Sequence, residues 1–147
     1  MAKAKRLSYE YYGMMVIACN GREYAIGSED KANKAVREYI QSSVWAFKPE
    51  YLASHSVWED IDGGEELIKL IQEKCEDGND ALIRLIQDFD GFFEEAVGLD
   101  GRGHFLATYD GYEMTLNEID DAQAQEIADL LEIERDEWIN TYVYRLN

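Results

Sequence analysis

The dipeptide Asn20-Gly21 is the feature that most constrains how this chain can fold. It separates residues 9–18, which are rich in aromatic and β-branched side chains, from a second, shorter run at residues 22–26. Asn and Gly tolerate the positive φ that a type I′ turn requires, so the pattern predicts a β-hairpin. Gly13 lies inside the first predicted strand and indicates a bulge there.

Helical periodicity dominates the middle of the chain. Ser28 is a predicted N-cap, and the apolar residues after it recur three and four apart as far as residue 47. Pro49 then ends this helix and opens a short second one. A further helix is predicted over residues 65–74, with Gly78 as its C-cap. Another is predicted over about 80–97, with Asn79 or Asp80 as its N-cap and a break or kink at Gly91. The side chains predicted to face inward from the first of these are Leu67, Ile68, Leu70, Ile71 and Cys75.

The C-terminal third predicts a second hairpin, another helix and a closing strand. The hairpin is predicted from residues 105–109 and 112–116, which flank a turn at Asp110-Gly111. A helix is predicted over about 121–131, with Ile127, Leu130 and Leu131 facing inward. Residues 134–137 are expected to form a polar loop. Residues 138–146 alternate in polarity and are β in composition, so we expect them to pair with the first hairpin.

These elements predict an α+β fold, with a small antiparallel sheet from the N-terminal hairpin and the C-terminal strand and several amphipathic helices packed on one face. A chain of 147 residues is expected to form a single domain, 1–147. Residues 1–8 are expected to form a flexible basic arm.

The net charge of −17 is distributed unevenly along the chain. Residues 1–50 carry eight Lys/Arg and six Asp/Glu, whereas residues 51–147 carry six Lys/Arg and 25 Asp/Glu. Self-repulsion that keeps the protein in solution explains such a charge, and so does a surface that binds a basic partner. Direct binding to nucleic acid is disfavoured, because the phosphates would be repelled.

Two cysteines, Cys19 and Cys75, do not make a disulfide framework. The basic N-terminus is not followed by the apolar region of a signal peptide, and no apolar run approaches the ~20 residues of a membrane helix. We therefore expect a cytoplasmic protein with reduced thiols and no membrane contact.

Carboxylates fall between the apolar positions of the predicted helices over residues 65–97. Residues three and four apart share a helix face, so these carboxylates form outer acidic faces. Such a surface can imitate the charge of a nucleic-acid backbone and dock into a Lys/Arg groove of a protein. The predicted partner-binding residues are Glu65, Glu66, Glu73, Glu76, Asp77, Asp80, Asp88, Asp90, Glu94 and Glu95.

A different class of function would use the glycine-rich stretch 100–111 as a small enzyme site or ligand site. The candidate ligand-binding residues are Asp100, Arg102, His104 and Asp110, and the simpler alternatives are a salt bridge for Arg102 and a structural hydrogen bond for His104. No nucleophile motif, phosphate loop or paired metal-ligand spacing is present, so no catalytic residue, metal or cofactor is predicted. A third possibility is an acidic structural or assembly module.

Three segments carry a resemblance to a known group of proteins. They read GREYAIGSE at 21–29, DGRGHFL at 100–106 with YDG at 109–111, and YVYRLN at 142–147. The chain resembles small acidic hypothetical proteins of bacteriophages and prophages, for which no catalytic residues are established. Small acidic phage proteins are often inhibitors of host defence, including anti-CRISPR and anti-restriction proteins. The resemblance thus implies a non-enzymatic inhibitor in the host cytoplasm that binds the basic surface of a nucleic-acid-handling host protein.

Overall fold

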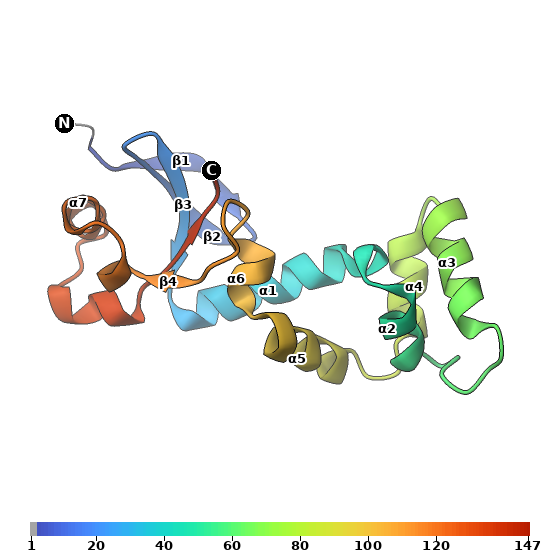
Figure 1. Cartoon of the computed structure of the whole chain (residues 1–147). Coiled ribbons are helices and arrows are strands. Elements are labelled where there is room, and N and C mark those ends of the chain that lie inside the picture. The colour runs from blue at the N-terminus through green and yellow to red at the C-terminus, as the bar shows by residue number, and fades with distance from the viewer. Residues whose placement is uncertain (1–2) are drawn as a thin grey trace. The chain divides into compact units, whose positions relative to one another are not determined.

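The computed structural model describes residues 3–147 and is coloured along the chain in Figure 1. Contacts within the chain group it into two compact units, which we describe separately. The sheet unit comprises Met1–Tyr39 and Asp100–Asn147, and the helical unit comprises Ile40–Leu99. The single domain expected from the chain length stays a prediction.

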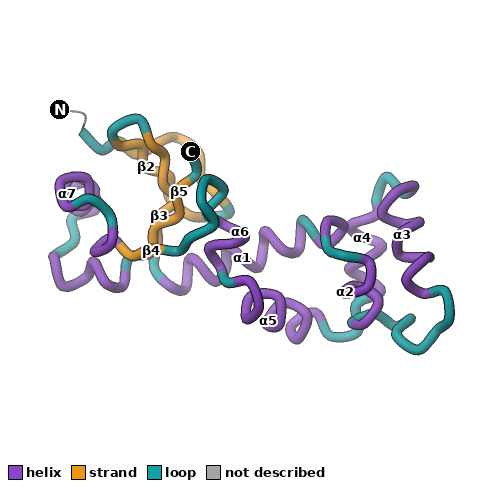
Figure 2. Tube along the Cα trace, in the orientation of Figure 1, coloured by secondary structure: helices purple, strands orange, loops and turns teal. Residues whose placement is uncertain are grey.

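The sheet unit is built on a five-stranded antiparallel sheet of order β1-β2-β3-β5-β4, drawn in orange in Figure 2. This confirms the α+β class and the sheet that joins the N-terminal hairpin to the C-terminal strand. The strands are β1 (Lys5–Tyr11), β2 (Met14–Cys19), β3 (Arg22–Gly27), β4 (Met114–Thr115) and β5 (Tyr142–Arg145).

The predicted hairpin at Asn20-Gly21 is confirmed. Asn20 has φ 53° and Gly21 has φ 79°, the positive values of a two-residue turn between β2 and β3. The bulge predicted at Gly13 is wrong, because Tyr12 (φ 50°) and Gly13 (φ 82°) form a second two-residue turn. Residues 9–18 are therefore parts of two strands, and the N-terminal sheet is a three-stranded meander.

The flexible arm predicted over residues 1–8 is wrong for its second half, and residues 1–2 lie outside the described residues. Residues 5–8 belong to β1, which pairs with β2 at the edge of the sheet. The register between these strands shifts between Arg6 and Glu10, which leaves extra residues on β1. Most of β1 is exposed, as is usual for a bulged edge strand.

Helix α7 (Asp121–Leu131) packs on one face of the sheet and confirms the predicted helix. Asp120 caps it by accepting the Gln123 N–H at 3.2 Å. The shared core contains Ile17, Tyr24, Ile26, Leu116, Ala124, Ile127, Ala128, Trp138 and Val143. Leu130 was predicted to face inward but is 41 % exposed.

The approach to β5 differs from the prediction, because the chain forms a 3₁₀ helix, η3 (Arg135–Asn140), before the strand begins at Tyr142. Glu134 and Glu137 form a capping box at its start, where the sequence predicted a polar loop. Trp138 lies in η3 and is buried in the core. The predicted pairing of the C-terminal strand with the hairpin is confirmed, since β5 pairs with β3.

Helix α1 (Glu29–Ser42) begins as predicted, because the Ser28 hydroxyl accepts the Lys31 N–H at 3.3 Å. It buries the predicted face at Ala32, Ala35 and Val36. The helix ends at Ser42 rather than at residue 47, and a short 3₁₀ helix, η1 (Val44–Ala46), follows it.

The helical unit contains α2 (Pro49–Ser54), α3 (Gly64–Lys74), α4 (Gly78–Leu85) and most of α5 (Phe89–Asp100). Pro49 opens α2 as predicted. The C-cap predicted at Gly78 is wrong, since Gly78 begins α4. The helix predicted over 80–97 is two helices, and α5 begins just before Gly91.

Only part of the inner face predicted for α3 is buried. Ile68 is fully buried and Ile71 is half-buried. Leu67, Leu70 and Cys75 are exposed, so the prediction is wrong for them. Two apolar side chains of α3 therefore point to solvent.

The hairpin predicted between residues 105–109 and 112–116 is wrong. Residues 102–106 form helix α6 (Arg102–Leu106) after a turn at Gly101 with φ 83°, and β4 pairs with β5 instead. Gly103 explains this arrangement, because α6 packs closely on the backbone of residues 111–113. A Cβ at Gly103 would lie 2.8 Å from the Tyr112 carbonyl carbon and 2.9 Å from the Gly111 oxygen.

Gly103→Ala is expected to destabilise the protein by about 2–3 kcal/mol, because the new methyl group would overlap backbone atoms that cannot move independently. The matched control is Gly98→Ala in α5, where an added Cβ meets nothing within 4 Å. That change is expected to stabilise the helix by about 0.5 kcal/mol. Urea unfolding of both variants measures the two effects, and equal stability of the variants would contradict the packing described.

Candidate functional site

The ten predicted partner-binding carboxylates all lie in the helical unit. Nine are exposed, and Glu65 is half-buried. Residues 40–99 contain four Lys/Arg and 14 Asp/Glu, a net charge of −10. The prediction of an exposed acidic surface on these helices therefore agrees with the structure.

Two of these carboxylates also have contacts inside the protein. The Asp88 carboxylate accepts the Gly91 N–H at 3.1 Å and caps the start of α5. The Glu95 carboxylate lies 2.5 Å from Nε2 of His55. Both side chains contribute to the internal structure of the helical unit. Sequence spacing could not reveal the contact of Glu95 with His55, because the two residues are 40 positions apart.

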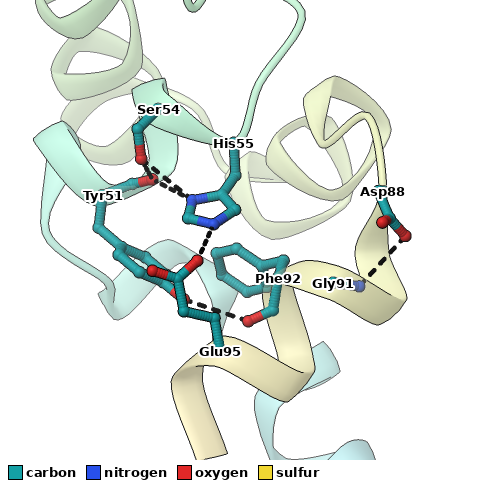
Figure 3. A network of polar contacts seen from close by, with 7 residues as sticks. All are labelled: Tyr51, Ser54, His55, Asp88, Gly91, Phe92 and Glu95. Carbon is teal, nitrogen blue, oxygen red and sulfur yellow. Dashed lines mark hydrogen bonds and ion pairs between the residues drawn. The ribbon is translucent and has the colours of Figure 1, made fainter. Parts of the chain in front are cut away.

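His55 is the centre of the polar network in Figure 3. Its Nδ1 lies 3.0 Å from both the Tyr51 carbonyl and the Ser54 hydroxyl, while its Nε2 faces Glu95. The ring also packs edge-on against Phe92, with centroids 5.5 Å apart. Tyr51 donates its hydroxyl to the Phe92 carbonyl at 3.1 Å, so α2 and α5 are joined by several contacts.

This network has the composition of a Ser-His-carboxylate site but a different geometry. A carbonyl and a carboxylate can only accept hydrogen bonds, so neither the Tyr51 carbonyl nor the Glu95 carboxylate can donate one to the ring. The Ser54 hydroxyl donates to the Tyr51 carbonyl at 2.8 Å and is thereby directed at its own helix end. The arrangement ties α2 to α5 and does not present an activated nucleophile.

An exposed surface on α3 combines apolar and acidic side chains, and we call Glu66, Leu67, Leu70 and Glu73 the α3 strip. Leu67 is 44 % exposed and Leu70 is 53 % exposed. Glu66 and Glu73 lie four residues before and three residues after Leu70, so one helix face carries both carboxylates beside the leucine. Lys74, four residues after Leu70, is exposed on the same face, so the carboxylates exceed the lysine by one there. A leucine pair beside this excess of carboxylates suits a partner surface that is basic and partly apolar.

The alternative ligand-binding residues in the sheet unit have separate surroundings. Asp100 and His104 are exposed, and the His104 ring packs on Phe105. The Asp110 carboxylate accepts the Tyr112 N–H at 3.0 Å within its own turn.

Arg102 is held inside the sheet unit by several groups. Its Nε donates to Glu113 at 2.7 Å and its Nη1 donates to Asn33 at 2.9 Å. The guanidinium also lies over the Tyr142 ring, 4.8 Å from the centroid. Burial and a hydrogen bond to the same Glu113 raise the pKa of Tyr144. The salt bridge is therefore the role that the structure gives Arg102.

The two cysteines lie in different environments. Cys75 is exposed, whereas Cys19 is buried and donates to Glu126 at 3.4 Å. Burial and that hydrogen bond raise the pKa of the Cys19 thiol to about 11. Within residues 3–147, no group of three or more His, Cys, Asp or Glu side chains is arranged to hold a metal ion.

Comparisons with protein-family models, curated proteins and solved structures find no match to this chain. Across the described part of the chain, none of the helices has the length and apolar character that a membrane span requires. The function therefore has to be argued from the residues and their geometry.

Arg102→Ala is expected to destabilise the protein by about 2–3 kcal/mol, because the side chain is 14 % exposed and its loss leaves Glu113 without its cation. His104→Ala, at an exposed position, is expected to change stability by less than about 0.5 kcal/mol. Thermal and urea unfolding measure both. Wild-type stability of the Arg102 variant would contradict a structural role and favour the ligand-site alternative.

Native protein is expected to react with one equivalent of a thiol reagent such as DTNB at pH 8, at Cys75. The Cys19 thiol stays protonated and shielded, so it reacts only after unfolding in guanidinium. Cys75→Ser should abolish the native reaction and leave the reaction of the unfolded chain at one equivalent. Rapid reaction of both native thiols would show that Cys19 is accessible.

Proposed function

We propose that this protein is a non-enzymatic inhibitor that binds the basic surface of a nucleic-acid-handling host protein. The observation that carries the proposal is the α3 strip, where exposed leucines and carboxylates share one helix face of a unit with net charge −10. The phage-type, anti-defence context comes from the sequence resemblance and is part of the same proposal.

The charge of the helical unit supports the nature of the partner. A unit with 14 Asp/Glu against four Lys/Arg attracts a Lys/Arg surface and repels phosphates. A groove that binds nucleic acid is a dense Lys/Arg surface, and an acidic helix can occupy it in place of the phosphates. Binding then competes with nucleic acid without contacting it.

The exposed leucines support binding rather than solubility alone. A surface that serves only to keep a protein in solution gains nothing from apolar side chains among its carboxylates. Leu67 and Leu70 provide apolar area at the centre of the α3 strip, and the flanking Glu66 and Glu73 provide the charged rim that typical interfaces have. The enzyme alternative receives no comparable support, because Arg102 and Asp110 are engaged in structural contacts.

The test is capture of a partner from bacterial lysate on the tagged protein, followed by identification by mass spectrometry. We expect a nucleic-acid-binding protein whose affinity falls by about tenfold or more between low and high salt, because screening weakens the attraction. DNA or RNA should displace the captured partner. Neutralising Glu66, Glu73, Glu76 and Asp80 to the corresponding amides should remove binding.

The matched control neutralises four carboxylates of the sheet unit, Glu38, Asp129, Glu132 and Asp136, which changes the net charge by the same amount. It should retain binding. Leu67→Ser with Leu70→Ser should weaken binding at every salt concentration, since apolar contact is not screened. Equal losses in the two charge variants would show that only total charge matters, and a partner that DNA or RNA does not displace would contradict the proposed surface.

A further inference from the structure

A cavity of about 320 Å³ opens in the sheet unit beside the C-terminal end of α7. It lies on the sheet face that α7 covers only in part. Its lining combines apolar side chains with the cations Arg6 and Lys31, the carboxylate of Glu10 and several neutral polar groups.

The cavity exists because α7 ends before it covers the whole sheet. Met15 pairs with Ile26 and Ile17 pairs with Tyr24, so these four side chains share one face. Helix α7 ends at Leu131, where Glu132 adopts the left-handed conformation with φ 57°. Beyond that point Met15 is half-buried, and residues that follow α7, Ile133 and Asn140 among them, line the cavity.

The cavity is half-open to solvent, and four apolar side chains line it beside exposed polar groups. Met15 and Ile26 come from the sheet, while Leu131 and Ile133 come from the end of α7 and the residues after it. Gly13 lies at the edge of the cavity, and a Cβ added there would meet nothing within 4 Å. A volume near the lower end of the roughly 300–1,000 Å³ typical of ligand pockets suits a small ligand.

The cavity carries an excess of positive charge in an acidic protein. The side chains of Arg6 and Lys31 line it, and among residues 3–147 neither has a hydrogen-bond or ion-pair partner. Glu10 is the carboxylate in the lining, so the charges leave an excess of one positive charge. This balance favours a ligand with a single negative charge.

Some of the polar groups in the lining are already engaged. The Ser28 hydroxyl accepts the Lys31 N–H, and the Thr141 hydroxyl donates to the Glu137 carbonyl at 3.0 Å. Anion recognition therefore falls to Arg6 and Lys31, with the Asn140 amide as a neutral donor.

We propose that this cavity binds a small amphipathic monoanion, a molecule with an apolar body and one carboxylate. The apolar body lies on Met15, Ile26 and Leu131, and the carboxylate faces Arg6 and Lys31. The site lies within the sheet unit and is independent of the partner surface on α3.

Octanoate is the probe for this site, with octanol as the neutral counterpart and acetate as the anion without an apolar body. In ¹H–¹⁵N spectra, octanoate should shift the amides of Gly13, Met15, Gly27 and Thr141 saturably. Octanol should bind at least about fivefold more weakly, and acetate should cause no saturable shift. Equal binding of octanol and octanoate, or shifts that never saturate, would overturn the proposal.

Two variants separate the apolar and charged parts of the site. Met15→Trp fills the cavity and should abolish octanoate binding. Arg6→Met with Lys31→Met keeps the apolar stems and should weaken octanoate about fivefold while leaving octanol unchanged. Lys5→Met with Lys48→Met removes the same charge elsewhere and should bind octanoate like the wild type. If Met15→Trp fails to fold, the charge variants still decide, because unchanged octanoate affinity without Arg6 and Lys31 would overturn the proposal.

Discussion

The antiparallel pairing of β3 with β5 is the interaction on which the sheet unit depends. It joins Ile26 to Val143 and is extended by the Leu146 N–H, which donates to the Glu23 carbonyl at 2.8 Å. This contact closes a loop of more than a hundred residues, at an entropic cost that rises slowly with loop length. Because β3 also pairs with β2, its position sets the register of the strands on both sides. Residues 40–99 can form their own unit inside this loop without interrupting the sheet.

The parts of the fold that could be predicted are those that local chemistry decides. Asn20-Gly21 specifies its turn through the positive φ of both residues, and Asp120 specifies the start of α7 through its side-chain cap. The turn at Tyr12-Gly13 escaped prediction because a tyrosine with φ 50° is an unusual residue for that position. The strand predicted after Gly101 is a helix, because short apolar runs fit a strand or a helix equally well. The close packing of Gly103 on residues 111–113 is a tertiary contact, which the sequence pattern does not report.

The candidate sites likewise have features that local sequence predicts and features that depend on the assembled fold. Exposure of the carboxylates on α3 follows from helical periodicity, so the sequence sufficed to predict it. The pairing of His55 with Glu95 joins two separate helices, and no spacing rule reports it. The exposure of Leu67 and Leu70 also could not be foreseen, because periodicity assigns apolar residues to a core without knowing how much of the helix its neighbours cover. The cavity beside α7 depends on where that helix ends relative to the sheet, which is a property of the assembled fold.

The two proposed sites use electrostatics on different length scales. In the proposed function the acidic helical unit acts at a distance, because many exposed carboxylates together attract a basic surface before contact, within the Debye length of about 10 Å at 0.1 M salt. The cavity acts at contact, because Arg6 and Lys31 lie beside an apolar space where an anion is partly removed from water. The overall charge of −17 opposes the approach of any anion, so only a ligand whose apolar body also gains from burial can bind there. A molecule with charge alone is repelled and one with an apolar body alone lacks the cationic contacts, which is why both properties are needed together.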